Sequence, residues 1–215
     1  MRNIVVAGKW EDYPLSGRGM KNKNYFILTI ALLFPVLALG QEDFYKRLSN
    51  AAIELTKQHV RYDPAYFSIP YPGGDVPSDR GVCTDVVIRA YRKLGIDLQK
   101  EVHLDMKANF NLYPQKWGLK RPDTNIDHRR VYNLMTFFSR KGKELPKTQN
   151  AEDYKPGDIV CWMLPGELTH IGIVVGRKVS GTNRYAVVHN IGGGQVLADC
   201  LFSYRIIGHY RYSKE

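Results

Sequence analysis

The chain has 215 residues, of which 44% are hydrophobic and 24% are charged, a composition that excludes disordered and fibrous proteins. Its length suits a single domain with a substantial core. The net charge is +10, but residues 1–40 hold five of the 31 basic and two of the 21 acidic residues, so the remainder carries about +7. The basic residues are scattered rather than gathered in an arm, so we expect no nucleic-acid partner.

The N-terminal region has the pattern of a secretory signal peptide. Lys21 and Lys23 precede an apolar run over residues 25–39, and the small residues Ala38 and Gly40 stand at its end. At about 15 residues, the run is short for a membrane span. We therefore expect the protein to be exported.

This pattern divides the chain into two parts. We expect residues 1–40 to be an upstream extension plus the signal peptide, with the true translation start at Met20, and residues 41–215 to be a single domain. Cleavage before Gln41 leaves no stable membrane span. The alternative is an N-terminal membrane anchor that stays attached.

The first half of the exported part is predicted to form helices joined by loops. Apolar residues at helical spacing predict helices over residues 41–60, 83–94 and 127–140. Residues 61–82 are rich in Tyr, Pro, Gly and Asp, and residues 96–124 are polar with two prolines, so both are predicted to be irregular.

The second half changes to the pattern of β-strands. Apolar, β-branched runs predict strands over residues 159–162, 171–175, 185–189 and 205–212. Helices followed by a strand meander are typical of an α+β fold. We expect N-terminal helices packed on one side of an antiparallel sheet of about five strands.

Three residues have the types and positions of a nucleophilic site. Cys83 is predicted to start a helix, where free N–H groups and partial positive charge lower a thiol pKa and bind an oxyanion. His170 opens one predicted strand and His189 closes the next, so an antiparallel hairpin brings them together. One imidazole is then the base and the other orients it; Asn190 is a rival for the orienting role.

Other interpretations of these residues remain open. A single cysteine is usually a small buried hydrophobe, and a single histidine at a strand end is usually structural. Cys83, His170 and His189 are also a possible zinc ligand set, although no Cys-x-x-Cys or His-Glu-x-x-His pattern accompanies them. Cys161 and Cys200 either form a disulfide or stay free, and we favour free thiols.

Several segments resemble the NlpC-type cell-wall peptidases. In chain order they are Tyr71-Pro-Gly-Gly, the segment Cys83-Thr-Asp-Val-Val-Ile-Arg-Ala-Tyr, Tyr154-Lys-Pro-Gly-Asp-Ile-Val, His170-Ile-Gly-Ile-Val-Val and Val188-His189. The resemblance covers roughly residues 70–212. Two further segments, Asn125-Ile-Asp-His-Arg-Arg-Val and Gly208-His-Tyr-Arg-Tyr, resemble the YijF-like subgroup, a domain of unknown function.

This resemblance implies a papain-like fold, no cofactor and a triad of Cys83, His170 and His189. It implies hydrolysis of an amide in the peptide stems of peptidoglycan through an acyl-enzyme. From the signal peptide we expect a periplasmic or extracellular protein, and we expect a monomer. The alternatives are a wall-binding or metal-binding module on the same fold, and an acyltransferase. Thr84-Asp85 replaces the family's Ser-Gly, and the hairpin between the two histidine strands is longer, so bond specificity does not carry over.

Six further residues are candidates for substrate binding, namely Tyr71, Asp79, Arg80, Asp127, His128 and Arg129. Asp79 and Arg80 either bind carboxylates of a stem peptide or pair with each other. The run from Asp127 to Arg130 forms a wall of the cleft for an anionic substrate, or else Asp127 caps a helix and the rest is solvated surface. Asp85 is expected to complement the helix dipole.

Overall fold

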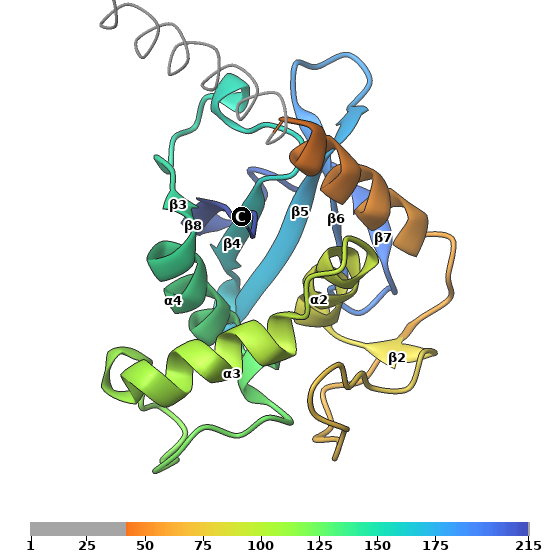
Figure 1. The fold of residues 1–215 in the computed structure, drawn as a ribbon. Coiled ribbons are helices and arrows are strands. Elements are labelled where there is room, and N and C mark those ends of the chain that lie inside the picture. The colour runs from red at the N-terminus through yellow and green to blue at the C-terminus, as the bar shows by residue number, and fades with distance from the viewer. Residues whose placement is uncertain (1–41, 215) are drawn as a thin grey trace, which may run out of the picture. The chain divides into compact units, whose positions relative to one another are not determined.

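The computed structural model describes residues 42–214, which Figure 1 shows as a coloured ribbon. The expected signal peptide, its cleavage site and the upstream start fall on residues 1–41 and lie outside the described residues. Over the described range, no helix has both the length and the apolar character that crossing a membrane requires.

Helices dominate the first part of this range and strands the second. Residues 42–55 are helical. The other helices are α2 (Cys83–Lys93), α3 (Leu98–Asn109) and α4 (Val131–Lys141), and the one-turn helices are η1 (Phe110–Leu112), η2 (Asp127–Arg129), η3 (Ala151–Asp153) and η4 (Pro165–Glu167). The strands are β1 (Arg61–Tyr62), β2 (Arg80–Gly81), β3 (Lys143–Glu144), β4 (Ile159–Met163), β5 (Thr169–Lys178), β6 (Tyr185–His189), β7 (Val196–Ala198) and β8 (Arg205–Arg211).

Within residues 42–214, six strands form one antiparallel sheet in the order β3-β8-β4-β5-β6-β7, and β1 pairs with β2 in a separate parallel pair. The α+β class and the strand meander are therefore confirmed. The sheet is larger than the expected five strands because β3 and β7, of two and three residues, add to its edges.

Both faces of the six-stranded sheet are buried by packed side chains. Alternate residues of β5 point to opposite sides, so Ile171 and Ile173 pack in the main core with the helices, whereas Val174 packs in a smaller core with Trp162 and Tyr154. Helix α2 packs against β5 and lies in front of the sheet in Figure 1. Each fully buried aliphatic side chain contributes about 1.5–3 kcal/mol, so this contact holds α2 against the sheet.

The prediction that residues 96–124 are irregular is wrong for α3. Asp97 caps this helix by accepting hydrogen bonds from two backbone N–H groups of its first turn. Leu98, Val102 and Met106 are buried along one narrow line, four residues apart. One apolar residue per turn is a weak pattern, and packing against the rest of the domain decides the helix.

The predicted helix over residues 127–140 is divided in two. Asp127–Arg129 forms the one-turn helix η2, Arg130 is extended with φ −104° and ψ 119°, and α4 starts at Val131. The first predicted helix also ends at residue 55 rather than 60. The break places Arg130 at a junction between two elements.

Candidate active site

Helix α2 begins at Cys83, where the sequence predicted a helix start. The first turn is capped by Asp85, whose Oδ2 accepts a hydrogen bond from the Val82 N–H at 2.7 Å. The Cys83 side chain is buried in the main core together with Ile171 of β5, whose backbone N–H acts to lower the pKa of the thiol. Cys83 therefore lies against the strand that carries His170.

The loop before Cys83 is held in place by Arg89 of α2. Its guanidinium bonds the carboxylate of Asp75 and the carbonyl oxygens of Val76, Pro77 and Arg80. A residue whose donors bind several backbone carbonyls fixes the loop's course. The helix start therefore occupies a defined position.

The two histidines meet as the hairpin prediction required. Nε2 of His170 lies 2.8 Å from Nδ1 of His189, and their ring centroids are 5.0 Å apart at an angle of 80°. The indole of Trp162, which faces His170 across β4 and β5, lies 5.7 Å from the His170 ring. Because Nε2 is engaged, only Nδ1 of His170 is free to exchange a proton with a thiol.

Gly172 keeps space open beside the histidine pair. A Cβ atom there would lie 2.7 Å from the Val187 side chain and 3.2 Å from Cβ of His189. The glycine in the His-x-Gly pattern is therefore required by the close approach of β6. A side chain at this position would displace the strand that carries the second histidine.

Asn190, the rival for the orienting role, bonds elsewhere. Its side-chain N–H₂ donates to the Gly81 carbonyl at 3.2 Å, two residues before the nucleophile. His189 is the residue in contact with His170. Asn190 instead ties the end of β6 to the loop that leads into α2.

Burial controls the charge states of the three groups. It raises the pKa of the Cys83 thiol to about 12, with Asp85 adding to the rise, although three backbone N–H groups, from Ile171, Thr84 and Cys83 itself, act against it. Burial lowers the pKa of His170 to about 3, with the neighbouring His189 adding to the effect, and burial also lowers the pKa of His189. The resting site holds a neutral thiol and neutral imidazoles, so the expected lowering of the thiol pKa by the helix start is corrected.

In the described part of the chain no side-chain hydrogen bond joins Cys83 to His170. Cys83 packs in the main core with Ile171, the residue after His170, whereas His170 pairs across β4 and β5 with Trp162 of the smaller core. In other enzymes such bonds often tighten only when substrate is bound.

Arg129, a predicted substrate-binding residue, forms a buried ion pair under the nucleophile. Its Nε and Nη2 lie 3.0 and 3.1 Å from the carboxylate of Asp85, and both side chains are 2% exposed. Thr84 donates a hydrogen bond to the Arg129 carbonyl at 3.1 Å. Asp85 was expected only to complement the helix dipole, but it also forms an ion pair with Arg129. The charge of Arg129 is therefore paired within the protein and is not free to bind a substrate.

Asp127 and His128 are also buried rather than on a cleft wall. One carboxylate oxygen of Asp127 accepts the N–H of Asp123, and the other accepts from Arg130 Nη1 at 3.1 Å. Burial raises the pKa of Asp127 and lowers the pKa of His128 to about 3. Both groups therefore organise the segment around η2.

The remaining three predicted binding residues lie in the loop before Cys83. The Tyr71 ring packs edge-on against His103 at 4.9 Å, and Arg80 bonds the carboxylate of Asp63 at 3.0 Å. Asp79 is mainly exposed, and its Oδ2 lies 3.8 Å from Nε of Arg80. This contact agrees with the alternative expectation that Asp79 and Arg80 pair with each other. None of the three lines the pocket beside Cys83.

That pocket has a volume of about 240 Å³ and lies between α2, η2 and the start of β5. Besides Cys83, the residues that matter to its chemistry are Tyr62, Trp117, Arg129, Arg130, Tyr132 and Thr169. Arg130 belongs to the polar run that was predicted to form a wall of the cleft, whereas no feature of the sequence pointed specifically to Trp117.

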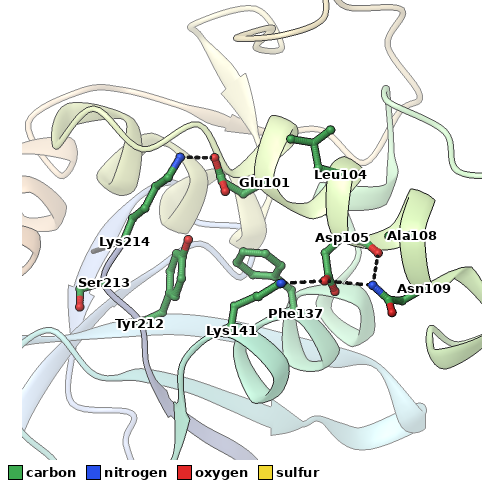
Figure 2. A pocket seen from close by; sticks show the side chains of 10 residues that line it. All are labelled: Glu101, Leu104, Asp105, Ala108, Asn109, Phe137, Lys141, Tyr212, Ser213 and Lys214. Carbon is green, nitrogen blue, oxygen red and sulfur yellow. Dashed lines mark hydrogen bonds and ion pairs between the residues drawn. The ribbon is translucent and has the colours of Figure 1, made fainter.

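A larger pocket, of about 530 Å³, lies between α3, α4 and the C-terminal segment. Figure 2 shows that its charged groups bind one another: Lys214 bonds Glu101 at 2.6 Å, and Lys141 lies 3.1 Å from Asp105. Cys83 lines the smaller pocket and not this one, whereas His170 lines neither of the two. We therefore place the candidate site at the smaller pocket.

The cysteines outside the site are free, as we favoured. Cys161 on β4 packs in the main core on the helix side of the sheet, whereas Cys200 packs against the smaller core on the opposite side. A disulfide requires Cα atoms within about 7 Å and side chains that face each other, which opposite faces of a sheet do not provide.

The zinc alternative depends on the nitrogens that the histidine pair leaves free. Nε2 of His170 and Nδ1 of His189 are hydrogen-bonded to each other, so a metal would have to bind Nδ1 of His170 and Nε2 of His189. Among residues 42–214, no group of three or more His, Cys, Asp or Glu is placed to hold a metal ion.

Comparison with known sequences gives two matches over most of the chain. The model of the domain of unknown function DUF1287 matches residues 49–212. The chain is 59% identical over 179 residues to "Uncharacterized protein YijF" of Escherichia coli (strain K12), which covers 83% of this chain and 86% of that protein.

Comparison with solved structures gives more distant likenesses. NlpC1 and NlpC2 from Trichomonas vaginalis share 18% and 20% identity over 80% and 79% of this chain, with TM-scores of 0.42 and 0.41. This chain spans about half the length of either protein, 45% and 48%. An N-acetylmuramoyl-L-alanine amidase from Bacteroides uniformis shares 18% identity over 79% of this chain and 99% of its own, with a TM-score of 0.45.

Proposed function

This chain belongs to the DUF1287 family, and from that premise and the geometry of the site we propose that it is an exported cysteine amidase or endopeptidase. Its substrate is an amide bond in the stem peptides of peptidoglycan. The observation that carries the proposal is the position of Cys83 at the start of α2, in one core cluster with the residue that follows His170, together with the hydrogen bond between His170 and His189.

The neutral site favours general-base catalysis over a preformed ion pair. Nδ1 of His170 takes the thiol proton as the sulfur attacks the scissile carbonyl, and backbone N–H groups of the first turn of α2 stabilise the oxyanion. His170 then gives this proton to the leaving amine, and the C–N bond breaks to leave an acyl-enzyme on Cys83. A water molecule, deprotonated by His170, hydrolyses the thioester and regenerates the thiol.

His189 has a distinct part in this scheme. For His170 to accept a proton at Nδ1, its Nε2 must carry a proton and donate it to Nδ1 of His189. His189 thus fixes the tautomer of the base and stabilises the imidazolium when it forms.

The choice of substrate rests on charge and on the family resemblance. The part of the chain after residue 40 carries about +7, which attracts an anionic polymer such as the cell wall. The segments around Cys83, His170 and His189 resemble those of NlpC-type peptidases, which act on peptide stems. Export would bring the protein into contact with this polymer.

Digestion of purified peptidoglycan, with the new termini identified by mass spectrometry, tests the proposal. We expect Cys83→Ala to abolish cleavage and His170→Ala to reduce it by about 10²–10⁴-fold or more, because general acid–base catalysis is worth that much. His189→Ala should retain more activity, and His189→Asn or His189→Gln more still, because the orienting group acts only through His170.

The measurement is the single-turnover rate on one defined stem peptide, with circular dichroism as the control for folding. Activity of His170→Ala near that of the original protein, with His189→Ala inactive, would reverse the two roles. Full activity of both variants would contradict the triad. Binding to the wall without new termini would favour the non-catalytic module, and transfer to an added amine would favour the acyltransferase.

A further inference from the structure

The pocket beside Cys83 has an uneven charge. Its lining includes two arginines, Arg129 and Arg130, and no Asp or Glu. Arg129 is bound to the buried Asp85 and is 2% exposed, so it cannot reach a ligand without breaking that ion pair. Arg130 is therefore the lining cation to consider.

Arg130 is held rigidly but keeps hydrogen-bond donors free. Its guanidinium carbon lies 4.1 Å over the centre of the Trp117 ring, and its Nη1 bonds Asp127 at 3.1 Å. The side chain is 16% exposed. A guanidinium has five N–H donors, and among the described residues the Nε and Nη2 groups of Arg130 have no partner.

A second cation strengthens the positive potential at this site. Lys116 Nζ lies 4.1 Å over the ring of Tyr132, which lines the same pocket. None of the ion pairs within residues 42–214 includes Lys116. The pocket is also smaller, at about 240 Å³, than a site that encloses a whole ligand, so it admits one part of a larger substrate.

We propose that Arg130, stacked on Trp117, is the residue that selects substrates with a carboxylate close to the amide attacked by Cys83. The planar fork of a guanidinium matches the two oxygens of a carboxylate. This inference rests on the proposed function and defines its substrate class: a stem peptide with free carboxylates is favoured over one in which they are amidated.

The test measures binding rather than turnover. Cys83→Ala protein is titrated by calorimetry with a synthetic muramoyl tripeptide that has free carboxylates, and with the same compound amidated at those carboxylates. A charge-assisted hydrogen bond to a partly buried arginine gives about a tenfold to hundredfold difference in affinity. In Cys83→Ala/Arg130→Gln this preference should disappear, through weaker binding of the acid form alone.

Matched variants separate recognition from folding. Arg47→Gln removes another arginine paired with an aspartate, on the exposed face of the helix of residues 42–55, and should keep the preference. Adding Asp127→Asn to Arg130→Gln removes the carboxylate left without its partner, and the preference should still be absent. Arg130→Lys keeps the charge without the fork and should give an intermediate preference.

The outcomes distinguish this inference from the proposed function. Equal binding of both compounds, binding of neither, or a preference that survives Arg130→Gln overturns the inference, even where the original protein cleaves stem peptides. A preference that depends on Arg130 supports it, even where the original protein cleaves neither compound and the proposed hydrolysis fails.

Discussion

At the residue scale, the state of Cys83 results from two opposed effects. The helix start supplies N–H groups that favour a thiolate, and burial with the nearby Asp85 disfavours it. Burial has the larger effect and raises the thiol pKa to about 12. The position at the helix start therefore does not set the reactivity of the Cys83 thiol by itself, because reactivity also depends on how exposed the thiol is.

This balance predicts the pH dependence of alkylation. With the thiol pKa at about 12 and the His170 pKa at about 3, both groups are neutral near pH 7. The thiolate fraction then rises about tenfold per pH unit, so the rate of Cys83 labelling by iodoacetamide should rise in proportion from pH 6 to 10. Urea-unfolded protein is the control, and its rate should level off above about pH 9.

Peptide mapping gives the rate at each cysteine. Cys83 borders a pocket and should react faster than the fully buried Cys161, whereas Cys200, which is half-buried with a thiol pKa of about 12, is not expected to react more slowly than Cys83. A plateau of Cys83 labelling between pH 5 and 8 would reveal a thiolate–imidazolium pair and contradict the neutral site.

At the scale of elements, the start of α2 is fastened to η2. The Asp85–Arg129 pair is buried from solvent, and Arg129 also donates to the Ala65 carbonyl at 3.0 Å. Three segments distant in sequence therefore meet beneath the nucleophile. Removing one partner of such a pair destabilises the protein, because the remaining charge stays buried without a partner.

We accordingly predict that Arg129→Ala lowers the free energy of unfolding by about 3–5 kcal/mol, because it leaves the Asp85 carboxylate buried without a partner. Thr84→Ala, which removes one hydrogen bond to the Arg129 carbonyl, should lower it by about 1 kcal/mol. Urea denaturation measures both. A loss below 1 kcal/mol for Arg129→Ala would show that the pair does not hold this corner of the domain.

At the scale of the whole molecule, one sheet separates two cores. The helices cover one face with the main core, and Tyr154, Leu201 and neighbouring loop residues cover the other. The catalytic candidates lie where β5 begins and β6 ends, beside the start of α2. The site therefore depends on the packing of the helices on the sheet as well as on the hairpin.

For the complete chain we predict export with removal of the N-terminal region. The basic, apolar and small-residue order before Gln41 is that of a signal peptide, so the exported protein should begin at or near Gln41. N-terminal sequencing of the exported protein measures this. A soluble protein that still carries Met1 or Met20 would contradict the prediction.

The sequence by itself determined the α+β class, the strands of the meander and the helix start at Cys83. These features follow from local periodicity and from a change of period along the chain. It also predicted the meeting of His170 and His189, because adjacent strands of a hairpin fix which ends are neighbours. Helix α3 was missed, since its single apolar residue per turn gives no clear periodicity.

Only the tertiary structure decided the environment of the site. Burial of Cys83 and His170 set their charge states, and the break at Arg130 separated a buried Arg129 from a neighbour that faces the pocket. Two consecutive arginines are equivalent in a sequence pattern. Their roles differ because solvent exposure and partners more than 40 positions away, such as Asp85, are properties of the packed chain and not of its local order.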